Sequence, residues 1–311
     1  MRESKFQIEV TTGRLTLPVV AIFSLVLWSL SIQDWNELIS LGLFVIIGYL
    51  IIETNTTFTL IRTRTTMPVC LSWCFATVLF FLHPFEWGNL VTLTFLLSVY
   101  YLFKSYESTQ PAIPIYHTFL FIGIGSIIFP QLIYFAPLFF ASMIPFRSYT
   151  LKSFIASLLG LITPFWFVFG YAFYFEQIHL LTDPIEEMIH FYPINYTAIK
   201  LNEGISWGVI TLSLLIGSFH YWKISYTDKT RTRIYHSFMI FAGLWTILLS
   251  ILQPIHLREL LQIQLILTAF LNGHLFTLTR NRFSNIYFIV TFVTLTILLI
   301  YNYGCNSSIF N

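Results

Sequence analysis

The stretch ELLQIQLILTAFLNGHLFTLT, residues 259–279, decides what kind of protein this chain is. After its first residue it holds no Asp, Glu, Lys or Arg. A helix crosses the hydrocarbon core of a bilayer with about 20 apolar residues, so the stretch is long enough to span a membrane. It also carries Gln264, Thr268 and Asn272 in this apolar setting. The stretch therefore predicts a membrane-spanning helix with one polar side.

The rest of the chain repeats this composition. Hydrophobic residues make up 56% of the 311 residues and charged residues only 10%, against about 25% charged in an ordinary globular domain. No soluble core buries so much apolar surface, and in lipid a helix satisfies its own backbone hydrogen bonds. We predict an all-α, polytopic transmembrane helix bundle that forms a single integral membrane domain over residues 1–311, with about 11 spans. The predicted spans are residues 15–32, 36–58, 67–82, 87–103, 113–129, 131–146, 154–175, 205–222, 234–253, 259–279 and 286–303.

The fifth and sixth predicted spans are short and contain Pro114, Pro137 and Pro145. Proline removes a helical hydrogen bond and bends the chain. An alternative prediction is therefore a kinked hairpin that crosses only partway, which leaves about nine spans and the same orientation for the rest.

The charges give the predicted bundle an orientation. With the N-terminus in the cytoplasm and the C-terminus outside, all basic residues except Lys200 and Arg258 lie in cytoplasmic segments. Most acidic residues then lie in outer segments. This segregation agrees with the excess of Lys and Arg that cytoplasmic loops carry in membrane proteins, so we expect an integral membrane protein with its N-terminus in the cytoplasm.

The polar residues of the tenth span point to a candidate substrate-binding stripe. On a helix Gln264, Thr268 and Asn272 fall within about 80° of one another, and Arg258 with Gln262 extends the same side. One interpretation is a set of hydrogen bonds between helices. The other is an outward-facing polar cavity with Arg258 at its rim, or with Arg258 paired to nearby carboxylates.

An outer loop over residues 176–204 is predicted to hold a short amphipathic helix at the membrane interface. Asp183 would cap it, Pro184 would stand at its first position and Pro193 would end it. Glu186, Glu187 and His190 would share its polar face, either as a solvated surface or as a weak catalytic candidate. One Glu-x-x-His is only half of a di-metal motif, so we predict no metal site and no cofactor.

Asp34 and Glu37 in the first outer loop are the other weak catalytic candidates. Polytopic glycosyltransferases that act on lipid-linked sugars place an acidic residue in their first outer loop, where a carboxylate serves as a base or holds a metal. The loop is much shorter here, and few outer cations are present to hold a pyrophosphate.

Two short segments resemble each other: FTLIRTR, residues 58–64, and FTLTRNR, residues 276–282. Both end a span that runs from the outside to the inside. We interpret their arginines as contacts to anionic lipid headgroups at the cytoplasmic face. Membrane lipids are therefore expected partners, with other membrane proteins as further partners and no nucleic acid.

Three segments resemble an uncharacterised family of polytopic inner-membrane proteins from Bacteroidetes. They are NTTFTLIRTRTTMP (residues 55–68), SLLGLITPFWF (residues 157–167) and NGHLFTLTRNRFSN (residues 272–285). The resemblance implies a bacterial inner membrane and a cell-envelope setting, and it transfers no catalytic residues.

Three classes of function stay open at this point. The sequence favours a non-catalytic membrane subunit or scaffold over an enzyme. The first alternative is a permease or flippase with an outward-facing polar cavity lined by the tenth span. The second is a glycosyltransferase-like enzyme that acts on a lipid-linked sugar at the outer face.

Overall fold

The computed structural model describes residues 5–29, 32 and 35–307. These residues form α-helices, short 3-10 helices and loops, with no β-strand among them. The chain divides into two compact units, where the sequence shows no sign of a division. Unit 1 comprises residues 1–86 and 195–311, and unit 2 comprises residues 87–194 and is inserted between the two parts of unit 1.

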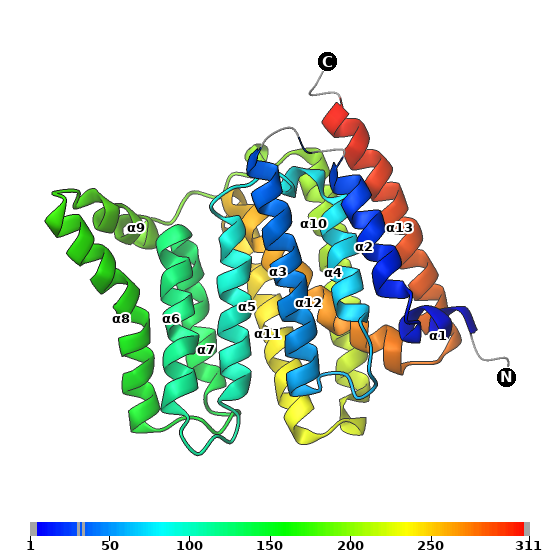
Figure 1. Ribbon diagram of the computed structural model, residues 1–311, viewed down its shortest axis with the longest axis horizontal. Coiled ribbons are helices and arrows are strands. Elements are labelled where there is room, and N and C mark those ends of the chain that lie inside the picture. The colour runs from blue at the N-terminus through cyan, green and yellow to red at the C-terminus, as the bar shows by residue number, and fades with distance from the viewer. Residues whose placement is uncertain (1–4, 30–31, 33–34, 308–311) are drawn as a thin grey trace. The chain divides into compact units, whose positions relative to one another are not determined.

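Unit 1 is a helix bundle built from both ends of the chain (Figure 1). Its 3-10 turns are η1 (Phe80–Leu82), η3 (Tyr196–Ala198), η4 (Ser225–Thr227) and η5 (Pro254–His256). Its α-helices are α1 (Lys5–Thr12), α2 (Thr16–Ser29), α3 (Trp35–Phe58), α4 (Met67–Val78), α10 (Leu201–Ile224), α11 (Thr230–Leu252), α12 (Leu257–Leu278) and α13 (Arg282–Ser307).

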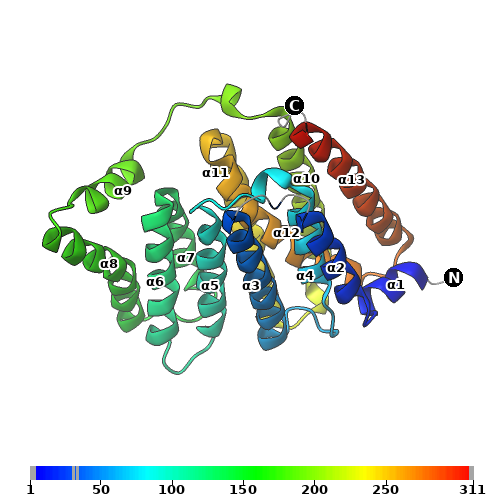
Figure 2. The ribbon, with the colours of Figure 1, turned by 45° about the horizontal axis from the view of Figure 1, so that its top comes forward.

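Helix α12 is the central element of unit 1. It contacts α10, α4, α11, α1 and α13 (Figures 1 and 2). In its most apolar stretch of 18 residues, 94% is buried. Its sequence is apolar almost all round, which is typical of a helix enclosed by other helices. Gly273 allows close approach to α4, because a Cβ there would lie 2.9 Å from Cγ of Pro68.

Unit 2 is a smaller bundle. Its elements are α5 (Asn89–Lys104), α6 (Ala112–Ile128), η2 (Pro130–Phe135), α7 (Ala136–Ser142), α8 (Leu151–Tyr174) and α9 (His179–Ile189). Helix α6 packs along α8 at very short range, because a Cβ at Gly160 would lie 2.3 Å from the backbone oxygen of Tyr116. Small residues permit this approach between membrane helices.

The structure does not confirm about 11 spans. Among the described residues, six helices are long and apolar enough to cross a membrane, namely α3, α8, α10, α11, α12 and α13. Four further apolar helices have 14, 12, 16 and 17 residues: α2, α4, α5 and α6. At 1.5 Å per residue they reach about 18–26 Å, short of a hydrocarbon core of about 30 Å.

The sixth predicted span is not one helix. Residues 130–135 form the 3-10 turn η2, and α7 has only seven residues. Both begin with a proline in their first positions, Pro130 and Pro137. Proline cannot continue a preceding helix without loss of a hydrogen bond, so these residues divide the segment.

The amphipathic helix of the outer loop begins earlier than predicted. Helix α9 starts at His179, its N-cap position is Ile178, and Pro184 lies inside it. Asp183 is therefore a helical residue and not the cap. The capping interpretation failed because His179–Thr182 continue the helical pattern upstream, and a proline near the start of a helix removes only one hydrogen bond.

Candidate functional site

The predicted polar stripe joins α12 to its neighbours. The side-chain amide of Gln264 donates to the Thr211 hydroxyl on α10 over 2.8 Å. The side-chain nitrogen of Asn272 donates to the backbone oxygen of Ser213 over 3.3 Å. Its side-chain oxygen accepts a hydrogen bond from the Tyr287 hydroxyl of α13 over 3.3 Å. The Thr268 hydroxyl bonds to the backbone of its own helix. Gln264, Thr268 and Asn272 are fully buried, so the described part of the stripe acts as interhelical contact.

Arg258 lies in a cluster of carboxylates at the other end of the stripe. Its guanidinium donates to Glu203 on α10 over 2.7 and 3.1 Å and to Glu86 over 3.3 Å. The Glu203 side chain is only 7% exposed, and a buried carboxylate is costly without a cation beside it. Gln262 is half-buried nearby. The geometry gives Arg258 the role of a salt-bridge partner.

The catalytic candidates lie in separate parts of the chain. Asp34 falls outside the described residues, and Glu37 stands in the first turn of α3. Glu187 accepts a 3.4 Å hydrogen bond from Gln131, and both belong to unit 2. Glu186 is exposed, and His190 follows the last residue of α9 with an extended backbone. The three residues of the loop therefore do not share one helical face. No cluster of three or more His, Cys, Asp or Glu suited to a metal occurs within the described residues.

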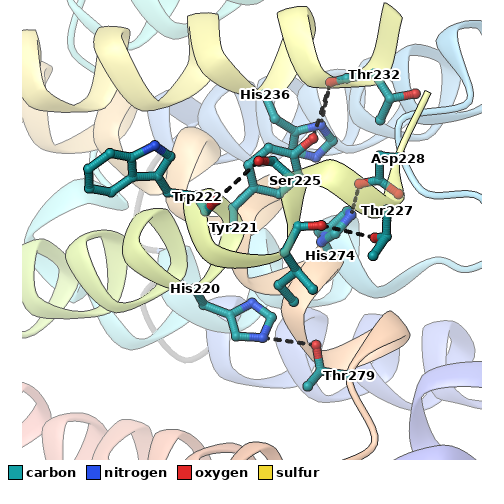
Figure 3. A network of polar contacts seen from close by, with 11 residues as sticks. His220, Tyr221, Trp222, Ser225, Thr227, Asp228, Thr232, His236, His274 and Thr279 are labelled. Carbon is teal, nitrogen blue, oxygen red and sulfur yellow. Dashed lines mark hydrogen bonds and ion pairs between the residues drawn. The ribbon is translucent and has the colours of Figure 1, made fainter. Parts of the chain in front are cut away.

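A buried network that the sequence analysis missed lies at the opposite end of α12 (Figure 3). Nε2 of His274 on α12 lies 2.8 Å from Oδ2 of Asp228, which stands between η4 and α11. Their side chains are 3% and 4% exposed. The His236 ring of α11 lies 4.9 Å from that of His274 and stacks on Tyr221 of α10 at 4.4 Å. Four segments of unit 1 thus meet around one buried hydrogen bond between His274 and Asp228.

The electrostatics of the network favour the ionised carboxylate. Burial by itself would raise the pKa of Asp228, but the hydrogen bond and charge of His274, with the charges of His236 and Arg62, outweigh it. The pKa of Asp228 therefore falls below its usual value. Nε2–H of His274 is then the donor to the carboxylate, because an ionised carboxylate only accepts.

A cavity of about 930 Å³ adjoins this network. It is lined by the C-terminal part of α10, the end of α12, the start of α13 and Arg62 from the segment between α3 and α4. Its described lining includes Arg62, Lys223 and Arg280 together with His220 and His274, and no Asp or Glu. The rest of the wall is largely apolar. A cationic cavity with apolar walls is suited to an anionic amphiphile.

The sequence carried part of this information. Arg62 and Arg280 are the first arginines of the two similar segments FTLIRTR and FTLTRNR, which the sequence analysis assigned to lipid headgroups in general. The pairing of Asp228 with His274 joins residues 46 positions apart, and hydropathy contains no signal for it. The only hint was a histidine off the polar side of an otherwise apolar span.

Comparison of the chain with models of known families, with curated proteins and with solved structures finds no match. The class of the protein therefore follows from its own helices. Within the residues that the structure describes, six helices are long and apolar enough to span a bilayer, which indicates an all-α, multi-pass integral membrane protein.

Proposed function

We propose that the protein is a multi-pass protein of the bacterial inner membrane that binds anionic lipid headgroups at its cytoplasmic face and serves as a non-catalytic membrane subunit. The observation that carries this proposal is the separation of charge between the two ends of unit 1. We call the end where α3 stops, α10 meets α11 and α12 meets α13 the basic end. Its cations are Arg62, Arg64, Lys223, Lys229, Arg231, Arg233, Arg280 and Arg282.

The opposite end of unit 1, which we call the acidic end, offers no comparable surface. Its cation Arg258 is held by Glu203 and Glu86, and Lys200, the N-cap residue of α10, is a second basic residue there. Basic residues close to a bilayer are attracted to anionic headgroups by about 1 kcal/mol each, and cytoplasmic loops carry the excess of such residues. The charge separation therefore favours an orientation with the basic end in the cytoplasm.

The hydrogen bonds of α12 favour a subunit over a permease with an outward-facing cavity. Such a cavity requires Gln264 and Asn272 to face a ligand, but these residues are fully buried and bonded to α10 and α13. Asp34 and Glu37 supply no observation in favour of a glycosyltransferase. The resemblance to polytopic envelope proteins of Bacteroidetes agrees with the proposed membrane.

Cysteine labelling in intact cells tests the orientation. Cys305 is replaced by serine, and Cys70 and Cys74 are buried. Single cysteines then replace Tyr226 at the basic end, 77% exposed, and Ile255 at the acidic end, 55% exposed. A membrane-impermeant maleimide should label only the position at Ile255 before lysis and both positions after lysis. Labelling of the Tyr226 position alone before lysis would contradict the proposal.

Electron spin resonance of spin-labelled lipids tests the headgroup association. The protein is reconstituted in phosphatidylcholine, and its selectivity for phosphatidylglycerol over phosphatidylcholine is measured at low and high salt. We expect a selectivity above one that falls as salt rises, because exposed charges are screened within about 10 Å at 0.1 M salt. Equal association of the two lipids at low salt would contradict the proposal.

Co-purification in mild detergent tests the subunit role. A membrane partner retained in a fixed ratio, and lost when its expression is abolished, would support it. A homogeneous protein without a partner would contradict that part of the proposal and leave the lipid association intact.

A further inference from the structure

We propose that the cavity at the basic end of unit 1 is a specific site for one lipid molecule that carries a phosphate group. The phosphate lies among Arg62, Lys223 and Arg280, and the hydrocarbon chain follows the apolar wall. This inference deepens the proposed association with anionic headgroups, on which it rests, by assigning it a defined site and a chemical class of ligand.

The first support is the convergence of three cations on one cavity. Arg62, Lys223 and Arg280 come from three different segments of unit 1 and line one cavity. None of them forms a salt bridge within the part of the chain that the structure describes. The carboxylate of Asp228, whose pKa the charge of Arg62 helps to lower, is hydrogen-bonded to His274. Arg62, Lys223 and Arg280 are exposed, and guanidinium groups match the oxygens of a phosphate with paired donors.

The second support comes from two histidines in the wall. His220 and His274 line the cavity, and each has its Nε2 atom engaged, with Thr279 Oγ1 at 3.0 Å and with Asp228 Oδ2 at 2.8 Å. The Nδ1 atom of each ring is buried without a hydrogen-bond partner in the described structure. Buried polar atoms are normally satisfied, and an exception points to a missing partner.

These nitrogens suit a phosphate in either protonation state. When the Thr279 hydroxyl donates to Nε2, the hydrogen of neutral His220 stays on Nδ1 and can donate to a phosphate oxygen only if the ligand reaches this buried atom. Neutral His274 donates through Nε2 to Asp228, so its Nδ1 accepts a hydrogen bond from a protonated phosphate oxygen; as an imidazolium it donates instead.

The third support distinguishes a lipid from a free phosphate ion. The cavity of about 930 Å³ lies near the upper end of the range of about 300–1,000 Å³ found for sites of drug-sized ligands, far more than a phosphate ion needs. Its apolar wall is formed by Leu215, Ile216, Phe219, Leu275, Leu278 and Phe283. Phe219 and Phe283 are 69% and 85% exposed on the long apolar helices α10 and α13. A chain laid against this wall continues into the surrounding lipid.

The two similar segments provide a matched control for the experiment. In FTLIRTR the first arginine, Arg62, lines the cavity and the second, Arg64, does not. In FTLTRNR the same holds for Arg280 and Arg282. The double variants Arg62→Gln/Arg280→Gln and Arg64→Gln/Arg282→Gln therefore remove the same charge from the same end of unit 1. Only the first pair removes it from the cavity.

Native mass spectrometry of the full-length protein in detergent measures the binding. The protein is titrated with dioleoyl phosphatidic acid, with dioleoyl phosphatidylcholine and with inorganic phosphate. We expect one tightly bound phosphatidic acid per wild-type chain. Loss of the two cavity arginines should weaken this binding about tenfold or more, the effect of losing charge-assisted hydrogen bonds. The Arg64→Gln/Arg282→Gln variant should bind within about twofold of the wild type.

Three results would overturn the inference. Equal weakening in both double variants would assign the binding to general surface charge and would leave the proposed headgroup association intact. Inorganic phosphate that binds as tightly and displaces the lipid would assign the cavity to a free ion. Unchanged binding in both variants would exclude the cavity. If the Arg62→Gln/Arg280→Gln variant does not give a monodisperse protein, the single variant Lys223→Gln is used in its place. Lys229→Gln is then the control, and the same outcomes apply.

Discussion

At the scale of single residues, the pair formed by Asp228 and His274 is the most constrained contact at the basic end. Both side chains are almost fully buried, and the helices α10, α11 and α12 meet around them. A buried hydrogen bond adds little to stability by itself, but removal of one partner leaves the other buried polar group unsatisfied. The pair therefore ties the loop between η4 and α11 to the end of α12.

The substitution Asp228→Asn should destabilise unit 1 by about 1–3 kcal/mol at pH 7, because the buried His274 loses its charged hydrogen-bond acceptor. The carboxyl pKa is lower in the folded protein than its usual value of 3.8, so the stabilisation is complete above the unfolded pKa. It is lost as pH falls through the folded pKa. Urea unfolding of the two proteins at pH 7 and at acidic pH measures the difference. The exposed Asp183→Asn is the control, and an equal loss in that variant would contradict the prediction.

At the scale of the element, α12 shows how a polar stripe in an apolar helix is used. The sequence placed Gln264, Thr268 and Asn272 on one side and left open whether that side faced a cavity or other helices. The structure turns it toward α10 and α13. The period of a helix predicts which residues share a face, but not which neighbour occupies that face, because that choice depends on packing with residues 15 to 59 positions away in the sequence.

Replacement of the stripe by leucine should therefore lower stability in proportion to the bonds lost. Asn272→Leu loses one bond to Ser213 and one to Tyr287, and Gln264→Leu loses one bond to Thr211. Each interhelical bond in a membrane is worth about 0.6–2 kcal/mol. Thr268→Val should be close to neutral, because its hydroxyl bonds only within α12. Unfolding in denaturant ranks the three variants, and the opposite order would show that the stripe has another role.

Helix α8 offers a matched pair of glycines. A Cβ at Gly160 would lie 2.3 Å from the carbonyl oxygen of Tyr116, whereas a Cβ at Gly170 would meet no atom within 4 Å. Gly160→Ala should thus separate α6 from α8 and cost about 1–3 kcal/mol, as overpacking does. Gly170→Ala should stabilise the helix by about 0.5–1 kcal/mol. Equal effects in thermal unfolding would show that α6 and α8 do not pack at short range.

At the scale of the whole molecule, hydropathy predicted the all-helical membrane class but not the number of full spans. The runs at residues 67–82 and 131–146 are apolar, yet α4 ends at Val78 before a 3-10 turn and α7 has only seven residues. Composition does not report where a helix ends. The charge pattern pointed to the basic end, while the cavity there stayed hidden because Arg62, Lys223 and Arg280 are far apart in the sequence.

The division into two units leads to a prediction for the whole chain. Each unit has a packed interior of its own, around α12 in unit 1 and between α6 and α8 in unit 2. We therefore expect each unit to unfold locally on its own, because regions that unfold cooperatively coincide with sets of contacting helices. In hydrogen exchange followed by mass spectrometry, Gly160→Ala should speed exchange in α6 and α8 and leave α11 and α12 as in the wild type. Asp228→Asn should do the reverse. Faster exchange in both regions from either single substitution would mean that the two units open as one cooperative structure.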